Sequence, residues 1–364
     1  MRGLRPAIFE SISRRRSELL TGEGVVGGRL KEVSHQQSDF ERPMQQAKSS
    51  SEPATTADPA ATLISVPPFD LARYLRERTG VIERQLAISI AESDGPANRL
   101  VEAMRYSLMA GGKRLRPILA LAACEAVGGQ IEPAIGYACA LEMIHTYSLV
   151  HDDLPCMDDD DLRRGRPTNH KVFGEAIATL AGDGLLTDAF GLFARSAKAA
   201  GIPAELVVDT IAELADACGS AGMVGGQVID LLAEGQPLTQ LELEQLHSKK
   251  TGALFVASVC GGARLGGAAP AQLQALQKYA RALGLAFQVT DDLLDVEQTT
   301  ERLGKRSQKD HERGKATYPS ILGIERSRAM AHELADHARD ALAGFDGRAE
   351  PLRMLAGFAV ERKL

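Results

Sequence analysis

The sequence has few aromatic residues: it contains no tryptophan, and Phe, Trp and Tyr together make up 4% of its 364 residues. Aromatic and β-branched residues favour strands, whereas the abundant alanine and leucine favour helices. The sequence also lacks an apolar run of the roughly eighteen residues that a membrane-spanning helix needs. These absences predict a helical protein without stable membrane association.

Cysteine and surplus positive charge are also scarce. The five cysteines form no CxxC pair, which argues against a disulfide framework or a zinc site and fits a reducing cytoplasm. A formal net charge of −6 argues against the basic face typical of nucleic-acid-binding proteins. We therefore expect a cytoplasmic protein that binds no nucleic acid.

The first 65 residues show no sustained apolar periodicity and include the stretch "SSSEPATTADPAAT". We predict a flexible extension over residues 1–65 and one domain over residues 66–364. A transit peptide is an alternative interpretation of the extension, but six acidic residues before residue 44 disfavour it. A translation start at Met44 is a further alternative.

From Pro67 onward, apolar residues recur at helical spacing almost without interruption. One helix ends at Gly111 and Gly112, and Pro117 suits the first position of the next. Further helices are predicted at about 133–154, 174–199, 203–234, 240–264, 270–296, 319–343 and 350–361. Because no alternating strand pattern of useful length occurs, we predict an all-α protein.

Two acidic clusters stand out against this background. The segment "HDDLPCMDDDDLRRGRP" (151–167) holds six aspartates within ten positions, followed by three arginines, and "DDLLD" (291–295) lies in an apolar helical segment. Like charges about 4 Å apart repel by roughly 4 kcal/mol at an effective dielectric near 20. Each cluster is therefore either solvated or built to hold cations. Because charges in an apolar helix are costly unless paired or metal-bound, the two clusters together predict one shared cation site.

The expected cation is a hard one. Carboxylate oxygens select magnesium or manganese, and magnesium commonly binds one or two carboxylates plus substrate phosphates. An EF-hand is excluded because Gly165 lies at the wrong position of the loop. Arg163 and Arg164 can donate forked hydrogen bonds to phosphate oxygens. We therefore predict a helical bundle around a central cavity, with both aspartate motifs at its mouth and a diphosphate as the ligand.

Two further features are ambiguous when taken singly. "GGKRLRP" (111–117) carries three cations just before a predicted helix start, where backbone N–H groups favour anions, yet basic turns are usually solvated. His145 on an apolar helix is either a ligand-binding residue or a hydrogen-bonded core histidine.

Taken together, these elements resemble the short-chain trans-isoprenyl diphosphate synthases, most closely bacterial farnesyl diphosphate synthases. The resemblance runs from about Phe69 to Leu364. It rests on "GGKRLRP", "EMIHTYSLVHDDLPCMDDDDLRRGRPT", "HKVFGE", "LAGD", "GGQVIDL", "KKTGALF", "FQVTDDLLD" and "GKATYP". It implies a prenyltransferase homodimer of the isoprenoid synthase fold that uses Mg²⁺, with Mn²⁺ as a substitute.

The resemblance also implies roles for particular residues. The diphosphate of isopentenyl diphosphate would be held by Lys113, Arg116, His145 and Arg164. The allylic diphosphate and its cation would be contacted by Arg163, Lys250, Thr251, Gln288 and Lys305. The metal would be ligated by Asp152, Asp158 and Asp291, with Asp153, Asp292 and Asp295 as weaker candidates. Asp152 and Asp158 cannot share a face of a regular helix, so Pro155 is expected to distort the chain between them.

Product length is expected to depend on Tyr147 and Ser148, which stand five and four residues before the first aspartate. In the family, residues at these positions are similar length gates, and an aromatic residue at the first is typical of farnesyl synthases. Packing of Tyr147 in the core is the alternative. The geranylgeranyl product of a longer-chain synthase stays open, and a terpene cyclase or a non-catalytic partner subunit are remoter alternatives.

Overall fold

The computed structural model describes residues 69–90, 94–301 and 316–361, with side chains described up to residue 296 in the second of these ranges. The predictions for the extension over residues 1–65 and for Lys305 fall outside the described residues.

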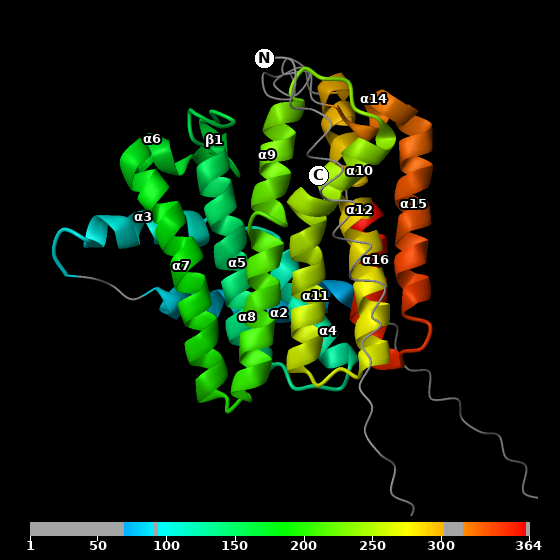
Figure 1. Ribbon diagram of the computed structural model, residues 1–364, viewed down its shortest axis with the longest axis horizontal. Helices are drawn as coiled ribbons and strands as arrows, with labels where there is room; N and C mark the ends of the chain where they lie inside the picture. Colours follow the sequence, from blue (N-terminus) through cyan, green and yellow to red (C-terminus); the bar gives the residue numbers. More distant parts are fainter. Residues whose placement is uncertain (1–68, 91–93, 302–315, 362–364) are drawn as a thin grey trace, which may run out of the picture. The chain divides into compact units, whose positions relative to one another are not determined.

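The described chain is built almost entirely of helices (Figure 1). The α-helices are α2 (Leu71–Ser89), α3 (Asn98–Leu108), α4 (Leu115–Ala126), α5 (Glu132–Asp152), α6 (Asn169–Phe173), α7 (Glu175–Ala199), α8 (Ala204–Cys218), α9 (Met223–Ala233), α10 (Gln240–His247), α11 (Ala253–Leu265), α12 (Pro270–Glu301), α14 (Tyr318–Leu322), α15 (Ile324–Ala341) and α16 (Glu350–Glu361). A π-helical segment, η1 (Ser248–Gly252), joins α10 to α11, and a 3₁₀ turn, η2 (Gly347–Ala349), precedes α16. The all-α prediction is confirmed.

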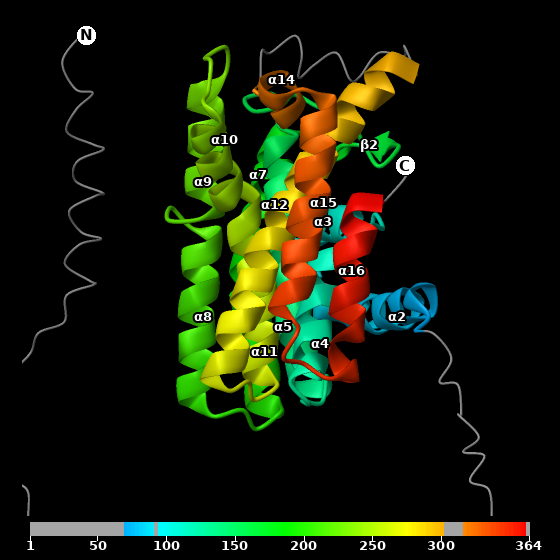
Figure 2. The ribbon, with the colours of Figure 1, turned by 90° about the vertical axis from the view of Figure 1, so that its right-hand side faces the viewer.

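Helix α5 lies inside the bundle because it is apolar on nearly every side. It packs against α4, α7 and α11, and α11 in turn packs against α12. Helices α5 and α12 both run toward the same end of the bundle (Figures 1 and 2). Asp152 ends α5, and Asp291 lies in the second half of α12. The two aspartate motifs therefore lie at one end of the bundle.

Two of the predicted helices are each divided in the structure. Residues 203–234 form α8 and α9, because Gly219 is extended and Gly222 also has non-helical backbone angles. Residues 319–343 form α14 and α15, because Gly323 has a φ of 81°, which a helix cannot accommodate. The single-helix predictions for these two segments were wrong because glycine conformation depends on the neighbouring packing.

Two smaller details also differ from the sequence predictions. Helix α4 begins at Leu115, so Pro117 is its third residue rather than its first. Residues Leu162–Arg163 (β1) and Arg166–Pro167 (β2) pair as a short antiparallel hairpin, where no strand was predicted. Strands of two residues are too short to show alternating polarity in a sequence.

One described helix, α7, is long and apolar enough to cross a membrane by length and composition alone. Buried helices of soluble proteins meet the same criterion, and α7 packs against α5.

Candidate active site

A cavity of about 410 Å³ opens at the end of the bundle where the aspartate motifs lie. Its walls come from α4, α5, the β1–β2 hairpin, η1 and α12. The lining residues are Arg116, His145, Leu149, Asp160, Leu162, Arg163, Arg164, Thr251, Phe287, Gln288 and Asp291. Seven of the residues predicted for substrate or metal binding are thus brought together from segments up to 175 positions apart, Arg116 and Asp291 being the farthest.

The first aspartate motif folds back on itself where α5 ends. The backbone N–H of Asp158 donates to the carbonyl oxygen of Asp152 at 2.8 Å, in the turn that contains Pro155. The predicted distortion between these aspartates is therefore present. Burial is the largest influence on Asp152 and raises its pKa to about 6, with Lys250 and Arg163 opposing and Asp158 reinforcing this shift. A buried carboxylate beside a second carboxylate is stabilised by a bound cation.

The donor set at this end of the cavity fits a hard divalent metal. Asp152, Asp158 and Asp291 offer only carboxylate oxygens, the ligands that magnesium and manganese prefer. Among the described residues, the oxygens of these three do not gather within 4.8 Å of one another. Magnesium commonly binds one or two carboxylates together with substrate phosphates.

Neighbouring aspartates of the same motifs have other partners. Asp153 is buried and forms an ion pair with Arg163, with 2.6 Å between Oδ1 and Nη2. Asp292 is buried and accepts hydrogen bonds from the backbone N–H of Tyr318 and from Nε2 of Gln288, both at 3.0 Å. Asp153 thus orients Arg163, which lines the cavity. Asp292 connects α12 to the start of α14.

Thr251 and Gln288 are fixed by the same hydrogen-bond chain. The hydroxyl of Thr251 donates to Oε1 of Gln288 at 2.9 Å, and the amide of Gln288 donates onward to Asp292. Both residues line the cavity. Their oxygens are therefore held in one orientation at the cavity wall.

Lys250 and Thr251 belong to the π-helical segment η1, and π-bulges frequently occur at functional sites. Nζ of Lys250 lies 2.5 Å from Oδ2 of Asp230 on α9. A side chain at Gly226 could not fit here, because a Cβ atom would lie 2.3 Å from the backbone nitrogen of Lys250. The "GGQVIDL" motif thus brings Asp230 to Lys250, a role that the sequence alone did not assign.

The cavity lining also carries positive charge. Nε of Arg116 is buried and has no hydrogen-bond partner among the described residues, while its guanidinium stacks on Phe255 at 5.2 Å. Burial lowers the pKa of Arg116 to about 10, although Glu142 and Asp291 oppose the shift. Burial and four nearby arginines also lower the pKa of His145 well below its usual value. His145 is therefore neutral at pH 7 and can donate one hydrogen bond.

The other described residues that were predicted for the site are not in the lining of this cavity; they are Lys113, Tyr147, Ser148, Asp152, Asp153, Asp158 and Lys250, with the weaker candidates Asp292 and Asp295. Lys113 is exposed on the loop before α4. Tyr147 is buried, its ring meets His151 edge-on, and its hydroxyl has no hydrogen-bond partner among the described residues. The hydroxyl of Ser148 donates to the carbonyl oxygen of His145 at 2.9 Å.

The sequence interpretation missed one further group. Ligand atoms of Asp159, Asp161 and His170 lie within 4.8 Å of one another, an arrangement that could hold a metal ion. However, Nζ of Lys171 lies 2.8 Å from Oδ1 of Asp161 and partly neutralises the group. Its members come from the hairpin region and α6, which no spacing pattern links.

Comparisons with known proteins agree with this geometry. The polyprenyl synthetase family pattern matches residues 97–343. A dimethylallyltranstransferase of Fischerella ambigua is 50% identical over 304 residues, which cover 83% of this chain and 86% of the relative. A geranylgeranyl diphosphate synthase of Cyanophora paradoxa is 49% identical over 295 residues, covering 81% of this chain and 97% of the relative.

A similar solved structure is the apo FPP/GFPP synthase of Zymomonas mobilis. It has a TM-score of 0.70 and 39% identity, with 80% of this chain and 98% of that chain covered. Both the family pattern and the relatives span the segments that line the cavity. The chain therefore belongs to the polyprenyl synthetase family and is a prenyltransferase with the isoprenoid synthase fold.

Proposed function

We propose that this prenyltransferase condenses isopentenyl diphosphate with the allylic substrates dimethylallyl and geranyl diphosphate to make farnesyl diphosphate. One observation carries the diphosphate chemistry: the cavity is lined by both carboxylates and arginines, one of which, Arg116, has a buried N–H without a partner among the described residues. Arginines and carboxylates in one cavity suit an anion bound directly by the former and through a cation by the latter.

The allylic diphosphate would bind at the aspartate end of the cavity. Asp152, Asp158 and Asp291 would hold Mg²⁺ there, and the bound ion would neutralise charge on the leaving group. Arg163 and Lys250 would donate hydrogen bonds to the same diphosphate, each already oriented by a carboxylate, Asp153 or Asp230. These contacts favour breaking of the allylic C–O bond because they stabilise the charge that the diphosphate acquires.

The second diphosphate would bind to the cations Arg116, Arg164 and Lys113, and neutral His145 would donate a hydrogen bond to it. The double bond of isopentenyl diphosphate would then attack the allylic cation, forming a new C–C bond, and the adjacent carbon would lose a proton to the released diphosphate. The oxygens of Thr251 and Gln288 lie at the wall where positive charge develops. No side-chain nucleophile is needed for this reaction.

The farnesyl product is supported by Tyr147, whose ring is buried in α5 about 7.5 Å along the helix from Asp152 at 1.5 Å per residue. A bulky residue at this depth would stop a chain that grows away from the diphosphates. The second candidate is geranylgeranyl diphosphate, because several relatives about 48% identical to this chain bear that name.

Product analysis tests these two candidates. Purified protein incubated with Mg²⁺, dimethylallyl diphosphate and excess isopentenyl diphosphate is expected to yield mainly fifteen-carbon alcohol after phosphatase treatment. A predominantly twenty-carbon product would favour the geranylgeranyl alternative. No elongated product at all would contradict the condensation itself. Cytoplasmic location stays a prediction from composition.

We also propose a homodimer. Val224, Val228 and Leu232 recur every four residues on α9 and are 44%, 50% and 76% exposed. Helix α7 is apolar, yet only 39% of its most apolar window is buried within the chain. Exposed apolar faces of this kind mark protein interfaces. One relative, by its name, is the large subunit of a heterodimeric geranylgeranyl synthase, so a mixed pair is the alternative.

Light scattering after gel filtration is expected to give twice the chain mass of 38.9 kDa. The double variant Val228→Glu/Leu232→Glu should run as a single chain, because two buried carboxylates oppose association. Ile88→Glu is the matched control, since Ile88 is 74% exposed on α2, away from this face. A monomeric wild-type protein at micromolar concentration would exclude the homodimer.

A further inference from the structure

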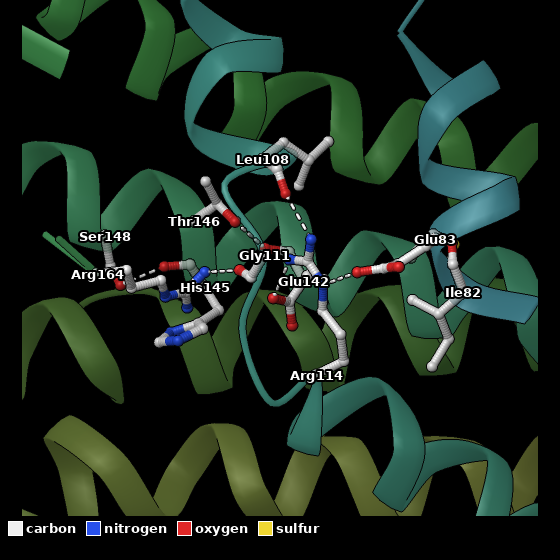
Figure 3. A network of polar contacts seen from close by, with 11 residues as sticks. Ile82, Glu83, Leu108, Gly111, Arg114, Glu142, His145, Thr146, Ser148 and Arg164 are labelled. Carbon is white, nitrogen blue, oxygen red and sulfur yellow. Dashed lines mark hydrogen bonds and ion pairs between the residues drawn. The ribbon is translucent and has the colours of Figure 1, made fainter. Parts of the chain in front are cut away.

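A buried ion pair joins α5 to the loop between α3 and α4. Nη1 of Arg114 lies 2.7 Å from Oε1 of Glu142, and the two side chains are 0% and 2% exposed (Figure 3). Nη2 of Arg114 donates to the carbonyl oxygen of Leu108 at 2.8 Å, and its Nε lies 3.7 Å from Oε1 of Glu83. One guanidinium thus connects the loop to α2, α3 and α5.

The loop backbone is unusual at the same residue. Arg114 has φ 48° and ψ 34°, a left-handed conformation that non-glycine residues adopt at a cost of about 1–3 kcal/mol. Gly111 and Gly112 before it also have positive φ angles, of 80° and 134°. An arginine therefore stands where glycine or asparagine would be less strained. The contacts of its side chain hold the backbone in this conformation.

A second arginine fixes the other end of the loop. Nη1 of Arg164, from the turn of the β1–β2 hairpin, donates to the carbonyl oxygen of Gly111 (Figure 3). Gly112 permits this approach, because a Cβ atom there would lie 2.6 Å from Nη1 of Arg164. The loop is thus anchored at Gly111 by a cavity residue and at Arg114 by the buried pair.

The residues on either side of Arg114 are those expected to bind isopentenyl diphosphate. Lys113 precedes it directly, and Arg116 follows two positions later and lines the cavity. Glu142 lies one helical turn before His145 on α5, so it shares a face with that cavity residue. The ion pair therefore sets the register between the cationic loop and the helix that carries His145.

We propose that Arg114 and Glu142 are positioning residues that aim Lys113 and Arg116 at the diphosphate of isopentenyl diphosphate, without touching the substrate themselves. This inference rests on the proposed binding of that substrate. A buried ion pair is weak evidence for stability, because apolar residues of similar volume often replace it at no loss. An apolar pair cannot reproduce the directional hydrogen bonds of Arg114 and Glu142. These hydrogen bonds fix the orientation of the loop.

Kinetics of two variants distinguish a role of the ion pair in positioning the loop from a role in stabilising the fold. The apolar double variant Arg114→Met/Glu142→Leu is expected to raise the KM for isopentenyl diphosphate by roughly ten-fold or more, since misplacing binding groups by about 1 Å can cost 10²-fold. The KM for geranyl diphosphate and the kcat at saturation should stay within about three-fold of wild type. The near-isosteric Glu142→Gln should shift the same KM in the same direction by a smaller factor.

The control is a second ion pair outside the cavity, which is partly exposed. Arg78 on α2 pairs with Glu125 on α4, where the hydroxyl of Tyr74 also donates to Glu125. Glu125→Gln should lower Tm without changing either KM. The positioning role would be overturned if the folded double variant kept the wild-type KM for isopentenyl diphosphate. It would also be overturned if the KM values for isopentenyl and geranyl diphosphate rose equally. If the double variant does not fold, an unchanged KM in Glu142→Gln overturns it.

Failure of the proposed function gives a different result. Lys113→Ala and Arg116→Ala remove the cationic groups that would bind the diphosphate. Each should therefore raise the KM for isopentenyl diphosphate at least as much as the double variant does. If neither changes that KM, the substrate does not bind at this wall, and the proposed binding site is wrong. If both change it while the double variant does not, only the positioning role is wrong.

Discussion

Asp152→Asn and Asp291→Asn are each expected to lower kcat on the order of 10²–10³-fold. Each change removes a carboxylate oxygen from the donor set that would hold Mg²⁺ against the departing diphosphate. Charge on the leaving group is largest in the transition state, so the loss should fall on kcat more than on binding. Steady-state kinetics with geranyl and isopentenyl diphosphate at several Mg²⁺ concentrations measure the effect.

The neighbouring aspartate supplies the control. Asp292 faces the backbone N–H of Tyr318 rather than the cavity, so Asp292→Asn should lower Tm and reduce kcat far less than Asp291→Asn does. Removal of divalent metal with EDTA should abolish turnover in the wild type, and added Mg²⁺ or Mn²⁺ should restore it. Turnover within a few-fold of wild type in either Asp152→Asn or Asp291→Asn would contradict the metal assignment.

Tyr147→Ala is expected to change the product rather than the rate. Removing the ring shortens the wall along α5 and opens room beyond the fifteen-carbon chain, so products of twenty carbons or more should dominate. The first condensation, which needs less depth, should keep its rate within a few-fold. Chromatography of the dephosphorylated products measures the distribution.

Two variants test whether bulk at Tyr147 is responsible. The tyrosine hydroxyl is buried without a partner among the described residues, so it contributes no hydrogen bond that a phenylalanine would lose. Tyr147→Phe should therefore keep the wild-type product length and raise Tm slightly, since an unpaired buried hydroxyl costs about 1–3 kcal/mol. Identical product lengths in Tyr147→Ala and the wild type would assign this tyrosine to core packing.

Some features of the fold followed from the sequence because their causes are local. The apolar surface of α5 predicted a buried central helix, and Pro155 predicted the distortion after Asp152. The helix breaks at Gly222 and Gly323 did not follow, because glycine takes a helical or a non-helical conformation according to what packs against it. The β1–β2 hairpin was missed because its strands have two residues each.

The chemistry of the site was determined by the sequence itself. Carboxylates in "DDLPCMD" and "DDLLD" favour hard cations, and the arginines and lysines of "GGKRLRP" and "LRRGRP" favour anions. Side-chain type and motif spacing are enough for this conclusion, and together with the family they indicate two diphosphate substrates.

The tertiary structure decided which member of each motif does which task. Asp291 lines the cavity, whereas adjacent Asp292 binds the N-terminus of α14. Arg116 lines the cavity, whereas Arg114, two residues earlier, is buried against Glu142. Neighbouring residues point in different directions, and their direction depends on how each helix or loop is rotated against partners distant in the sequence. Packing of the whole bundle sets that rotation, and a short sequence motif carries no information about this packing.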